Sequence, residues 1–292
     1  MSEKVVLITG ASSGIGLEVA LFLAKCGFKV YATMRDLSRR KTLEDEAEKR
    51  GLTLQVLKLD VTDKASIKSA VDKVFSECGE IYALVNNAGI IIQGYFEDVS
   101  DAEIRQVFGT NLFGTMAVTK AVLPYMRAAG RGRIVIISST GGRITAPGSS
   151  AYCSSKFALE GFGESLAQEV SPLGLWVVLV EPGIINTEFF GNNRHIAAKA
   201  LGPDGPYYDW FQQLEKMAQK EALASPTSVV DVAQAVHRAL TDKRPKLRYV
   251  VRFRAKFLLA LRRYLPGELF ERIWFYKMIR STTQPKLSGG GI

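Results

Sequence analysis

The sequence predicts an α/β fold: one doubly wound parallel sheet of about seven strands, with helices on both faces. Short apolar runs rich in β-branched residues alternate along the chain with segments of helical periodicity. Glycine-rich or polar segments follow several of these runs, and no repeat, linker or low-complexity tract interrupts the alternation. Hydrophobic residues make up 47% of the 292 residues, which suffices for one large core. We therefore expect a single domain.

The expected strands and helices succeed each other in the order that this fold requires. Strands are expected at residues 5–8, 29–33, 53–57, 83–85, 133–137, 175–180 and 247–251. Helices are expected at residues 17–26, 37–50, 64–78, 101–127, 152–170, 207–223 and 228–240. Parallel strands joined by right-handed helical crossovers bring their carboxyl ends to one edge of the sheet, where such folds bind ligands.

A glycine-rich turn separates the first expected strand from the first expected helix. It reads Thr9-Gly10-Ala11-Ser12-Ser13-Gly14-Ile15-Gly16. Glycines let the backbone turn tightly and approach a phosphate, and the following helix N-terminus offers free N–H groups and the positive end of its dipole. Because a strand precedes the turn and a helix follows it, the segment predicts a dinucleotide site.

The end of the second strand bears on the choice of cofactor. NAD sites usually place an acidic residue there to bind the ribose 2′-hydroxyl. Here Met34 and Arg35 occupy that corner, and Asp36 comes one or two positions too late. Arg35, with Ser13 and Arg39, would accept a 2′-phosphate, so we expect NADP(H) to be preferred over NAD(H). The alternative is that Arg35 is an ordinary solvated charge.

A tyrosine and a lysine four residues apart are the candidate catalytic pair. Tyr152 and Lys156 lie on one face of the expected helix, one turn from each other. A nearby ammonium lowers the pKa of a phenol from its usual value of about 10, which would let Tyr152 exchange a proton with a carbonyl or alcohol. Ser139 follows the strand at 133–137 and could hold the substrate oxygen beside the phenol. An ordinary helix with an exposed lysine is the alternative.

Further polar residues lie within or directly after apolar segments and are candidates for a functional role. Asn111 lies within an apolar helical stretch, either as a satisfied core amide or as a distortion that organises a water path. Asp60-Val61 follows the third strand, where a side chain could meet an adenine amino group. Asn86-Asn87-Ala88-Gly89 ends the fourth strand and would equally suit an ordinary turn. The segment 181–187, Glu-Pro-Gly-Ile-Ile-Asn-Thr, follows the sixth expected strand as a rigid loop.

The charge and the cysteines exclude several classes of protein. The net charge is +9, yet residues 241–292 carry 13 Lys and Arg against 3 Asp and Glu, which leaves the rest at −1. We therefore expect no nucleic-acid binding. Cys26, Cys78 and Cys153 stand singly, which predicts neither disulfides nor a metal site and suits a reducing compartment. We see no signal peptide and no apolar stretch of about 20 residues, so we expect a cytoplasmic protein.

The segment 252–280 interleaves basic residues with aromatic and aliphatic ones, and Pro266-Gly267 splits it into two amphipathic pieces. Such pieces could lie on an anionic membrane surface, dock on a partner subunit, or fold over a substrate pocket. Residues 281–292, with three consecutive glycines, are expected to be disordered.

In this order, the motifs resemble the short-chain dehydrogenase/reductase family over about residues 3–250, and within it the branch of 17β-hydroxysteroid and retinol dehydrogenases. The resemblance rests on the glycine-rich turn, Asp60-Val61, Asn86–Gly89, Asn111, Ser139, Tyr152-x-x-x-Lys156 and the segment 182–187. It implies a Rossmann-type NADP-binding catalytic domain over residues 1–251, with a substrate lid at about 188–225. It also implies a homodimer or homotetramer, in which the helices that hold Asn111 and Tyr152 would form the interface.

The resemblance also implies a role for each matching residue. Tyr152 is the general acid/base, Lys156 lowers its pKa and binds the nicotinamide ribose, Ser139 polarises the substrate carbonyl, and Asn111 holds a water. The implied cofactor-binding residues are Gly10, Ser12, Ser13, Gly14, Ile15, Gly16, Arg35, Asp60, Val61, Asn87, Ala88, Gly89, Tyr152, Lys156, Pro182, Gly183, Ile185 and Thr187.

The expected function is an NADP(H)-dependent interconversion of an alcohol with its ketone or aldehyde. The lid segment is rich in aromatic residues, so it either packs as a helix or favours a bulky hydrophobic substrate such as a steroid, a retinoid or a fatty chain. The alternatives are a 3-oxoacyl thioester reductase and an NADPH-binding sensor or scaffold without turnover.

Overall fold

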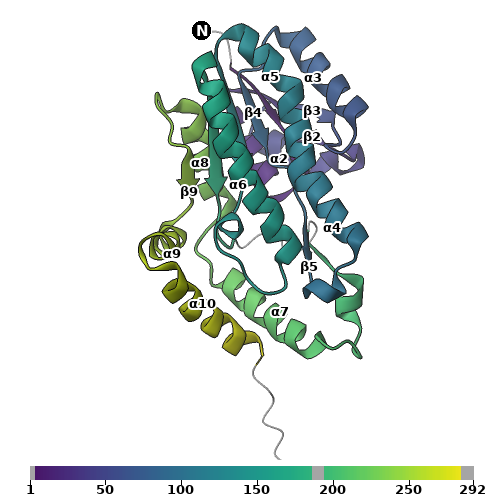
Figure 1. Ribbon diagram of the computed structural model, residues 1–292. Coiled ribbons are helices and arrows are strands. Elements are labelled where there is room, and N and C mark those ends of the chain that lie inside the picture. The colour runs from purple at the N-terminus through teal and green to yellow at the C-terminus, as the bar shows by residue number, and fades with distance from the viewer. Residues whose placement is uncertain (1–3, 186–193, 284–292) are drawn as a thin grey trace, which may run out of the picture.

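Seven parallel strands form the central sheet, in the order β3-β2-β1-β4-β6-β7-β9. Figure 1 shows the sheet among its helices. The structure is a computed structural model that describes residues 4–185 and 194–283. The strands are β1 (Val5–Ile8), β2 (Lys29–Met34), β3 (Gln55–Lys58), β4 (Ala83–Asn86), β6 (Gly132–Ile137), β7 (Leu175–Glu181) and β9 (Arg248–Val250). The predicted doubly wound α/β fold is confirmed.

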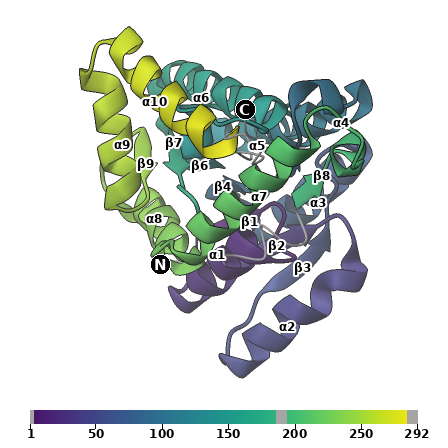
Figure 2. The ribbon, with the colours of Figure 1, turned by 90° about the horizontal axis from the view of Figure 1, so that it is seen from below.

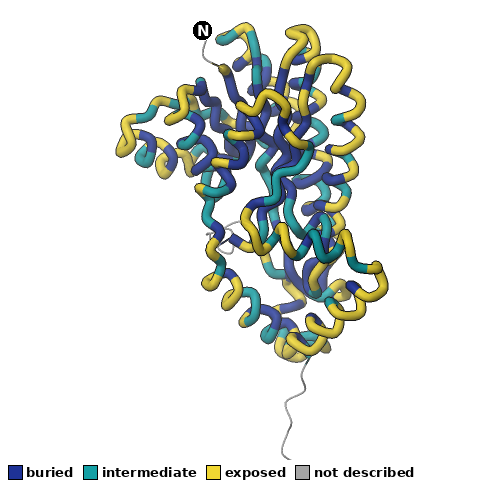
Figure 3. Tube along the Cα trace, turned by 90° about the vertical axis from the view of Figure 1, so that its left-hand side faces the viewer, coloured by how far each residue is buried: buried dark blue, intermediate teal, exposed yellow. Residues whose placement is uncertain are grey.

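Helices cover both faces of this sheet, and the dark tube of Figure 3 marks the buried strands between them. One core lies between the sheet and α1 (Gly14–Lys25), α2 (Arg40–Lys49) and α8 (Val229–Thr241). The other lies between the sheet and α3 (Lys64–Cys78), α5 (Thr115–Ala129) and α6 (Ser150–Val170). Consecutive strand residues are buried on both faces, as a parallel sheet between two helical layers requires.

The strand order reverses direction between β1 and β4. The chain runs outward from β1 to β3 on one side and from β4 to β9 on the other. In such sheets the crevice at this switch point, outside the carboxyl ends of the strands, is the ligand site. The glycine-rich turn leaves β1 and the segment Asn87–Gly89 leaves β4, so both predicted cofactor segments reach this crevice.

One long predicted helix contains an irregular segment. The stretch expected at 101–127 is built from α4 (Asp101–Phe108), a π-helical segment (Gly109–Gly114) and α5. A second, two-stranded parallel sheet of β5 (Ile91–Gln93) and β8 (Arg194–Ile196) was not predicted. Each strand is only three residues long and the two are about 100 residues apart, so neither gives a periodic signal. Arg194 binds Gln93 and Glu215, which ties this sheet to α7 (Tyr208–Leu223).

Two helices end the described chain, as the split at Pro266 predicted. They are α9 (Phe253–Tyr264) and α10 (Gly267–Thr282), and α10 packs against α7 (Figure 2). The expectation of disorder from residue 281 is wrong for Ser281 and Thr282, because the Thr282 hydroxyl donates to the carbonyl of Met278 and continues the helical packing. The rest of that expected tail, from residue 284, lies outside the described residues.

Candidate active site

The glycine-rich turn fits tightly against the segment that follows β4. Gly10 has φ +69°, and a Cβ there would lie 2.7 Å from the Cα of Ala88. A Cβ on Gly16 would collide with the side chain of Asn87 and the carbonyl of Gly10. Only glycine satisfies both positions, since any side chain would push the two segments apart. Gly14 also has a positive φ, +56°, but it faces open space.

Thr9 and Asn87 hold this turn against the segment after β4 through hydrogen bonds. The amide of Asn87 donates to the carbonyl oxygens of Thr9 and Gly10, at 3.0 and 2.9 Å. The backbone N–H groups of Asn87 and Ala88 donate to the Thr9 hydroxyl, at 3.0 and 3.1 Å. Asn87 thus holds the shape of the turn, and Thr9 is a supporting residue that the sequence analysis missed although it adjoins the first glycine.

The start of α1 presents backbone donors to the same crevice. Ser13 is the N-cap residue in an extended conformation, and its side chain makes no capping hydrogen bond. Uncapped N–H groups at a helix N-terminus bind anionic oxygens well, because the helix dipole adds to the hydrogen bonds. The residues present therefore fit the pyrophosphate of a dinucleotide, with Ser12, Ser13 and Ile15 half-buried around the turn.

The corner at the end of β2 carries an exposed cation and an engaged acid. Arg35 is exposed directly after the strand. The carboxylate of Asp36 accepts a hydrogen bond from the N–H of Ser38 at 2.9 Å, and this bond lowers the pKa of Asp36. Asp36 therefore caps the following turn, which leaves Arg35 and Arg39 as the charged groups at this corner.

Asp60 and Val61 lie on the far side of the crevice, after β3. The Asp60 carboxylate accepts hydrogen bonds from the N–H and the hydroxyl of Thr62, at 2.9 and 2.7 Å. Val61 is buried, and a Cβ on Gly114 would approach its side chain to 2.7 Å. This contact fixes the spacing between the Asp60 turn and the π-helical segment.

Ser139 and Tyr152 come together at the end of β6. Ser139 precedes a 3₁₀ turn (Thr140–Gly142), and its hydroxyl accepts a hydrogen bond from the N–H of Gly141 at 2.9 Å. A Cβ on Gly141 would lie 3.2 Å from the Ser139 oxygen and 3.3 Å from the Tyr152 ring. The predicted pair therefore converges over Gly141, with Tyr152 half-buried in the first turn of α6.

Lys156 lies deeper than Tyr152 and points toward the sheet. Its ammonium donates to the carbonyl oxygen of Ile137 at 2.8 Å and lies 5.8 Å from the centre of the Tyr152 ring. Burial lowers the pKa of Lys156 to about 8, against the opposing effect of the Glu160 carboxylate. At neutral pH the group is still largely protonated, so it can donate hydrogen bonds.

The predicted direction of the Tyr152 pKa shift is not the one found in this structure. Burial raises the pKa of Tyr152 to about 12; the Ser139 hydroxyl opposes the rise, and Cys153 adds to it. The physical reason is that removal of the ring from water disfavours the phenolate, while the Lys156 ammonium is engaged with Ile137. The Tyr152 hydroxyl is thus neutral at physiological pH.

Asn111 is a fully bonded amide inside the π-helical segment. Its oxygen accepts from the N–H of Ile90 at 2.8 Å, and its nitrogen donates to the Ile90 carbonyl and the Ser155 hydroxyl, both at 3.0 Å. Ser155 in turn donates to the carbonyl of Tyr152 at 2.7 Å. Asn111 therefore connects the segment after β4 to the first turns of α6. Both sequence interpretations hold in part, since the amide is satisfied and the helix is distorted where it lies.

The loop after β7 completes the edge of the crevice. Pro182 and Ile185 are buried, Gly183 is half-buried, and the Pro182 carbonyl accepts a hydrogen bond from the N–H of Thr140 at 2.9 Å. The loop is thus attached to the turn that carries Ser139. Thr187, also predicted as a cofactor residue, lies outside the described residues.

The C-terminal helices pack on the loop between Ser139 and Tyr152. Trp274 of α10 donates from its indole nitrogen to the carbonyl of Thr145 at 2.8 Å, and Phe270 packs with Ile144 and Leu259. A groove of about 650 Å³ runs between α10 and the start of α6. Its walls are mostly apolar and are formed by Thr145, Ala146, Pro147, Ser150, Cys153, Ser154, Phe157, Trp274, Phe275, Met278 and Ile279.

Comparison with known proteins agrees with this geometry. The family model for short chain dehydrogenases matches residues 4–197. This chain belongs to the short-chain dehydrogenase family. It is an oxidoreductase of the kind that acts on alcohol and carbonyl groups, within the branch that resembles retinol and hydroxysteroid dehydrogenases.

Three relatives show how far the similarity of this dehydrogenase extends. Retinol dehydrogenase 8 of Bos taurus is 39% identical over 279 residues, which cover 93% of this chain and 89% of that protein. The 17-beta-hydroxysteroid dehydrogenase type 1 of Homo sapiens is 36% identical over 272 residues, 90% and 81% of the two chains. A crystal structure of a short-chain dehydrogenase from Streptomyces avermitilis is 31% identical with a TM-score of 0.79, covering 97% and 99%.

Several supporting residues of this dehydrogenase site escaped the sequence analysis. Ser155 was visible only as a neighbour of Lys156. Glu181 stood out as a charge at the end of an apolar run, but nothing marked Arg143 and Arg248 as its partners. Trp274 joins the site across 129 residues of sequence, which no local pattern encodes.

Proposed function

We propose that this dehydrogenase uses NADP(H) to interconvert an alcohol and its ketone or aldehyde on a bulky hydrophobic substrate. The observation that carries the proposal is the convergence of Ser139, Tyr152 and Lys156 at the strand ends, beside a glycine turn shaped for a pyrophosphate. Residues 1–251 are the proposed catalytic domain, with 188–225 as its substrate lid and 252–280 as an extension.

The proposed mechanism gives each side chain one task. The cofactor, when bound, supplies or accepts hydride at C4 of its nicotinamide. Ser139 donates a hydrogen bond to the substrate carbonyl and orients it. Tyr152, neutral in its half-buried position, gives its proton to the carbonyl oxygen during reduction. Lys156, largely an ammonium at neutral pH, donates to the nicotinamide ribose hydroxyls.

Arg35 supports NADP(H) over NAD(H). It is an exposed cation directly after β2, at the corner where the 2′-substituent of the adenosine ribose would lie. Asp36, which would repel a phosphate, is held by its own capping hydrogen bond. A guanidinium can bind a phosphate through two parallel hydrogen bonds, which a ribose hydroxyl does not match.

Aromatic side chains in and against the proposed lid support a bulky apolar substrate. Tyr95 stacks on Tyr207 with ring centres 5.0 Å apart, and both pack with Trp210 of α7. The groove beside α10 adds further apolar surface next to the Ser139–Tyr152 loop. A test is the rate of NADPH oxidation with steroid, retinal, fatty and 3-oxoacyl carbonyls. Activity confined to 3-oxoacyl thioesters would favour a 3-oxoacyl thioester reductase instead. Tight NADPH binding without turnover would favour an NADPH-binding sensor or scaffold.

The helices α9 and α10 also support a peripheral contact with an anionic membrane. Phe253, Phe257 and Tyr264 lie on one face of α9 and are 76%, 55% and 78% exposed. Basic residues flank them, and aromatic residues beside Lys and Arg suit the headgroup region of a bilayer. Among the described residues no helix is both long and apolar enough to cross a membrane. Cosedimentation with vesicles of anionic or zwitterionic lipid tests the contact, and equal binding to both would contradict it.

We further propose a homodimer or homotetramer built on α5 and α6. Phe113 is 61% exposed in the π-helical segment beside Asn111, and Phe157 is 39% exposed on the catalytic helix. A second subunit on this face would cover both rings. Replacement of Phe113 with Glu should give monomers in sedimentation analysis, whereas an unchanged assembly would place the interface elsewhere.

A further inference from the structure

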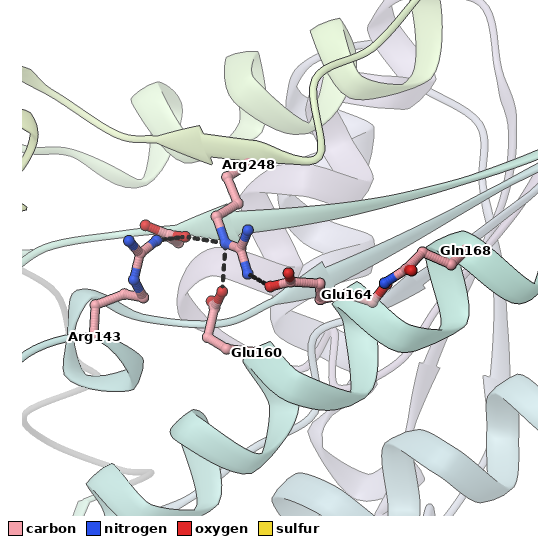
Figure 4. Close-up of polar contacts among 6 residues, drawn as sticks. Arg143, Glu160, Glu164, Gln168 and Arg248 are labelled. Carbon is pink, nitrogen blue, oxygen red and sulfur yellow. Dashed lines mark hydrogen bonds and ion pairs between the residues drawn. The ribbon is translucent and has the colours of Figure 1, made fainter. Parts of the chain in front are cut away.

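Five charged side chains from four segments of the chain meet beside α6, one helical turn and more beyond Lys156. Figure 4 shows their polar contacts. We call them the charged cluster: Arg143, Glu160, Glu164, Glu181 and Arg248. Arg248 Nε lies 2.9 Å from Glu160 and 3.3 Å from Glu181, and its terminal nitrogen lies 2.6 Å from Glu164. Arg143 reaches Glu181 from the other side, at 3.2 Å.

Two carboxylates of the charged cluster are buried and incompletely bonded. Glu160 and Glu181 are buried, whereas Glu164 is half exposed and solvated. One oxygen of Glu160 (Oε1) and one of Glu181 (Oε2) find no hydrogen-bond donor among the described residues. Both carboxylates approach the same N–H of Arg248, so their like charges lie close together. A proton on either one supplies the missing donor and removes the repulsion between the two negative charges.

The electrostatics agree with this geometry. Burial, together with the negative charge of Glu160, raises the pKa of Glu181 to about 7, against the opposing effects of Arg143 and Arg248. By contrast, Arg248 lowers the pKa of the exposed Glu164. Lys156 also faces the cluster, and the Glu160 carboxylate, one helical turn away, opposes the fall in the pKa of Lys156 that burial causes.

The charged cluster touches each segment that carries the chemistry. A Cβ on Gly142 would lie 2.9 Å from the carbonyl of Lys156 and 3.0 Å from the Glu160 side chain, so the Ser139 turn packs directly on α6. Arg143 follows that turn. Glu181 precedes Pro182, whose carbonyl is bonded to Thr140 in the same turn.

We propose that Glu160 and Glu181 share one proton near neutral pH and act as positioning residues for the reaction. While the proton is bound, the cluster holds the Ser139 turn, α6 and the Pro182 loop in register. Loss of the shared proton at higher pH leaves two buried, negatively charged carboxylates beside each other. Their repulsion loosens the Ser139 turn and the Pro182 loop. The kinetic part of this proposal rests on the proposed function; the shared proton does not.

The shared proton is tested by infrared spectroscopy, without substrate or cofactor. The wild-type protein should show the C=O stretch of a buried protonated carboxyl group at pH 5.5, and this band should vanish with a midpoint near pH 7. Glu181→Gln should lack the band, while Glu164→Gln, the matched exposed control, should keep it. A band that survives in Glu181→Gln, or is absent from the wild type, overturns the proposal.

A second variant keeps the test decisive if Glu181→Gln does not fold. Glu160→Gln removes the neighbouring negative charge, so the midpoint should move to lower pH and the band should remain. An unchanged midpoint overturns the shared proton, because it would mean that the two carboxyl groups titrate independently.

The positioning role is tested by the pH dependence of kcat and of KM for NADPH. In the wild type and in Glu164→Gln, KM should rise severalfold as the pH passes the midpoint near 7, and in Glu181→Gln this step should be absent. Identical profiles in all three proteins overturn the positioning role. If none of them turns over any carbonyl, the proposed function fails while the infrared result still decides the shared proton.

Discussion

The ammonium of Lys156 is bonded to the carbonyl oxygen of Ile137, 2.8 Å away at the last residue of β6. This bond fixes α6 to the strand that leads to Ser139. It also holds a cation in a buried position, where among the described residues the Lys156 ammonium donates one hydrogen bond, to Ile137, in place of its bonds to water. A charge kept at such a position costs stability, and the cost depends on pH.

The free energy of unfolding should depend on pH through the buried Lys156. The pKa of Lys156 is lowered in the folded state, to about 8, so between pH 8 and 10 the unfolded chain binds more protons than the folded one. The free energy of unfolding should therefore rise across this range, by at most about 3 kcal/mol from this group. In Lys156→Met the rise from this group should disappear. Urea denaturation at several pH values measures it, and equal slopes in both proteins would refute the assignment.

Tyr152→Phe tests the proton donor. The variant keeps the ring that packs beside Gly141 but loses the hydroxyl. Turnover should fall by about 10²- to 10⁴-fold, the range for loss of a general acid, while NADPH affinity and thermal stability stay unchanged. Cofactor titration and initial rates on the same preparation separate the two effects. Retained activity would remove Tyr152 from this role.

Arg35→Ala tests the choice of cofactor. Loss of a charged hydrogen bond to the 2′-phosphate should weaken NADPH by about 1.5–3 kcal/mol, while NADH affinity changes little. Arg40→Ala is the matched control, because Arg40 is an exposed arginine paired with Glu44 on α2. Equal losses for NADPH and NADH in Arg35→Ala would show that the residue does not contact the phosphate.

Gly16→Ala tests the fit of the glycine turn. The added methyl group would collide with Asn87 and Gly10, so it should cost about 1–3 kcal/mol and weaken cofactor binding. Gly161→Ala on α6 is the control, because its Cβ meets no atom within 4 Å and should stabilise the helix by about 0.5–1 kcal/mol. Similar melting temperatures for both variants would mean that the turn can yield.

The sequence predicted the sheet and the main site residues because local signals encode them. Buried strands appear in the sequence as apolar runs. The glycine turn is recognisable because only glycine fits at positions such as Gly10 and Gly16. The site then followed from topology, since parallel strands bring Ser139 and Pro182 to one edge.

What remained unpredicted depends on contacts between distant residues. Arg248 meets Glu160 across 88 positions, and Trp274 meets Thr145 across 129, so neither pair leaves a local trace. The direction of the Tyr152 pKa shift was also missed. It depends on how deeply the ring is buried and on where the Lys156 ammonium points, and the spacing of the two residues specifies neither.

The most direct test of the central claim is the initial rate of cofactor oxidation by the purified protein, with NADPH and NADH offered separately over a panel of apolar carbonyls. The account predicts turnover with NADPH on at least one bulky ketone or aldehyde, much slower turnover with NADH, and none in Tyr152→Phe. A faster rate with NADH, or equal rates for the wild type and Tyr152→Phe, would contradict it.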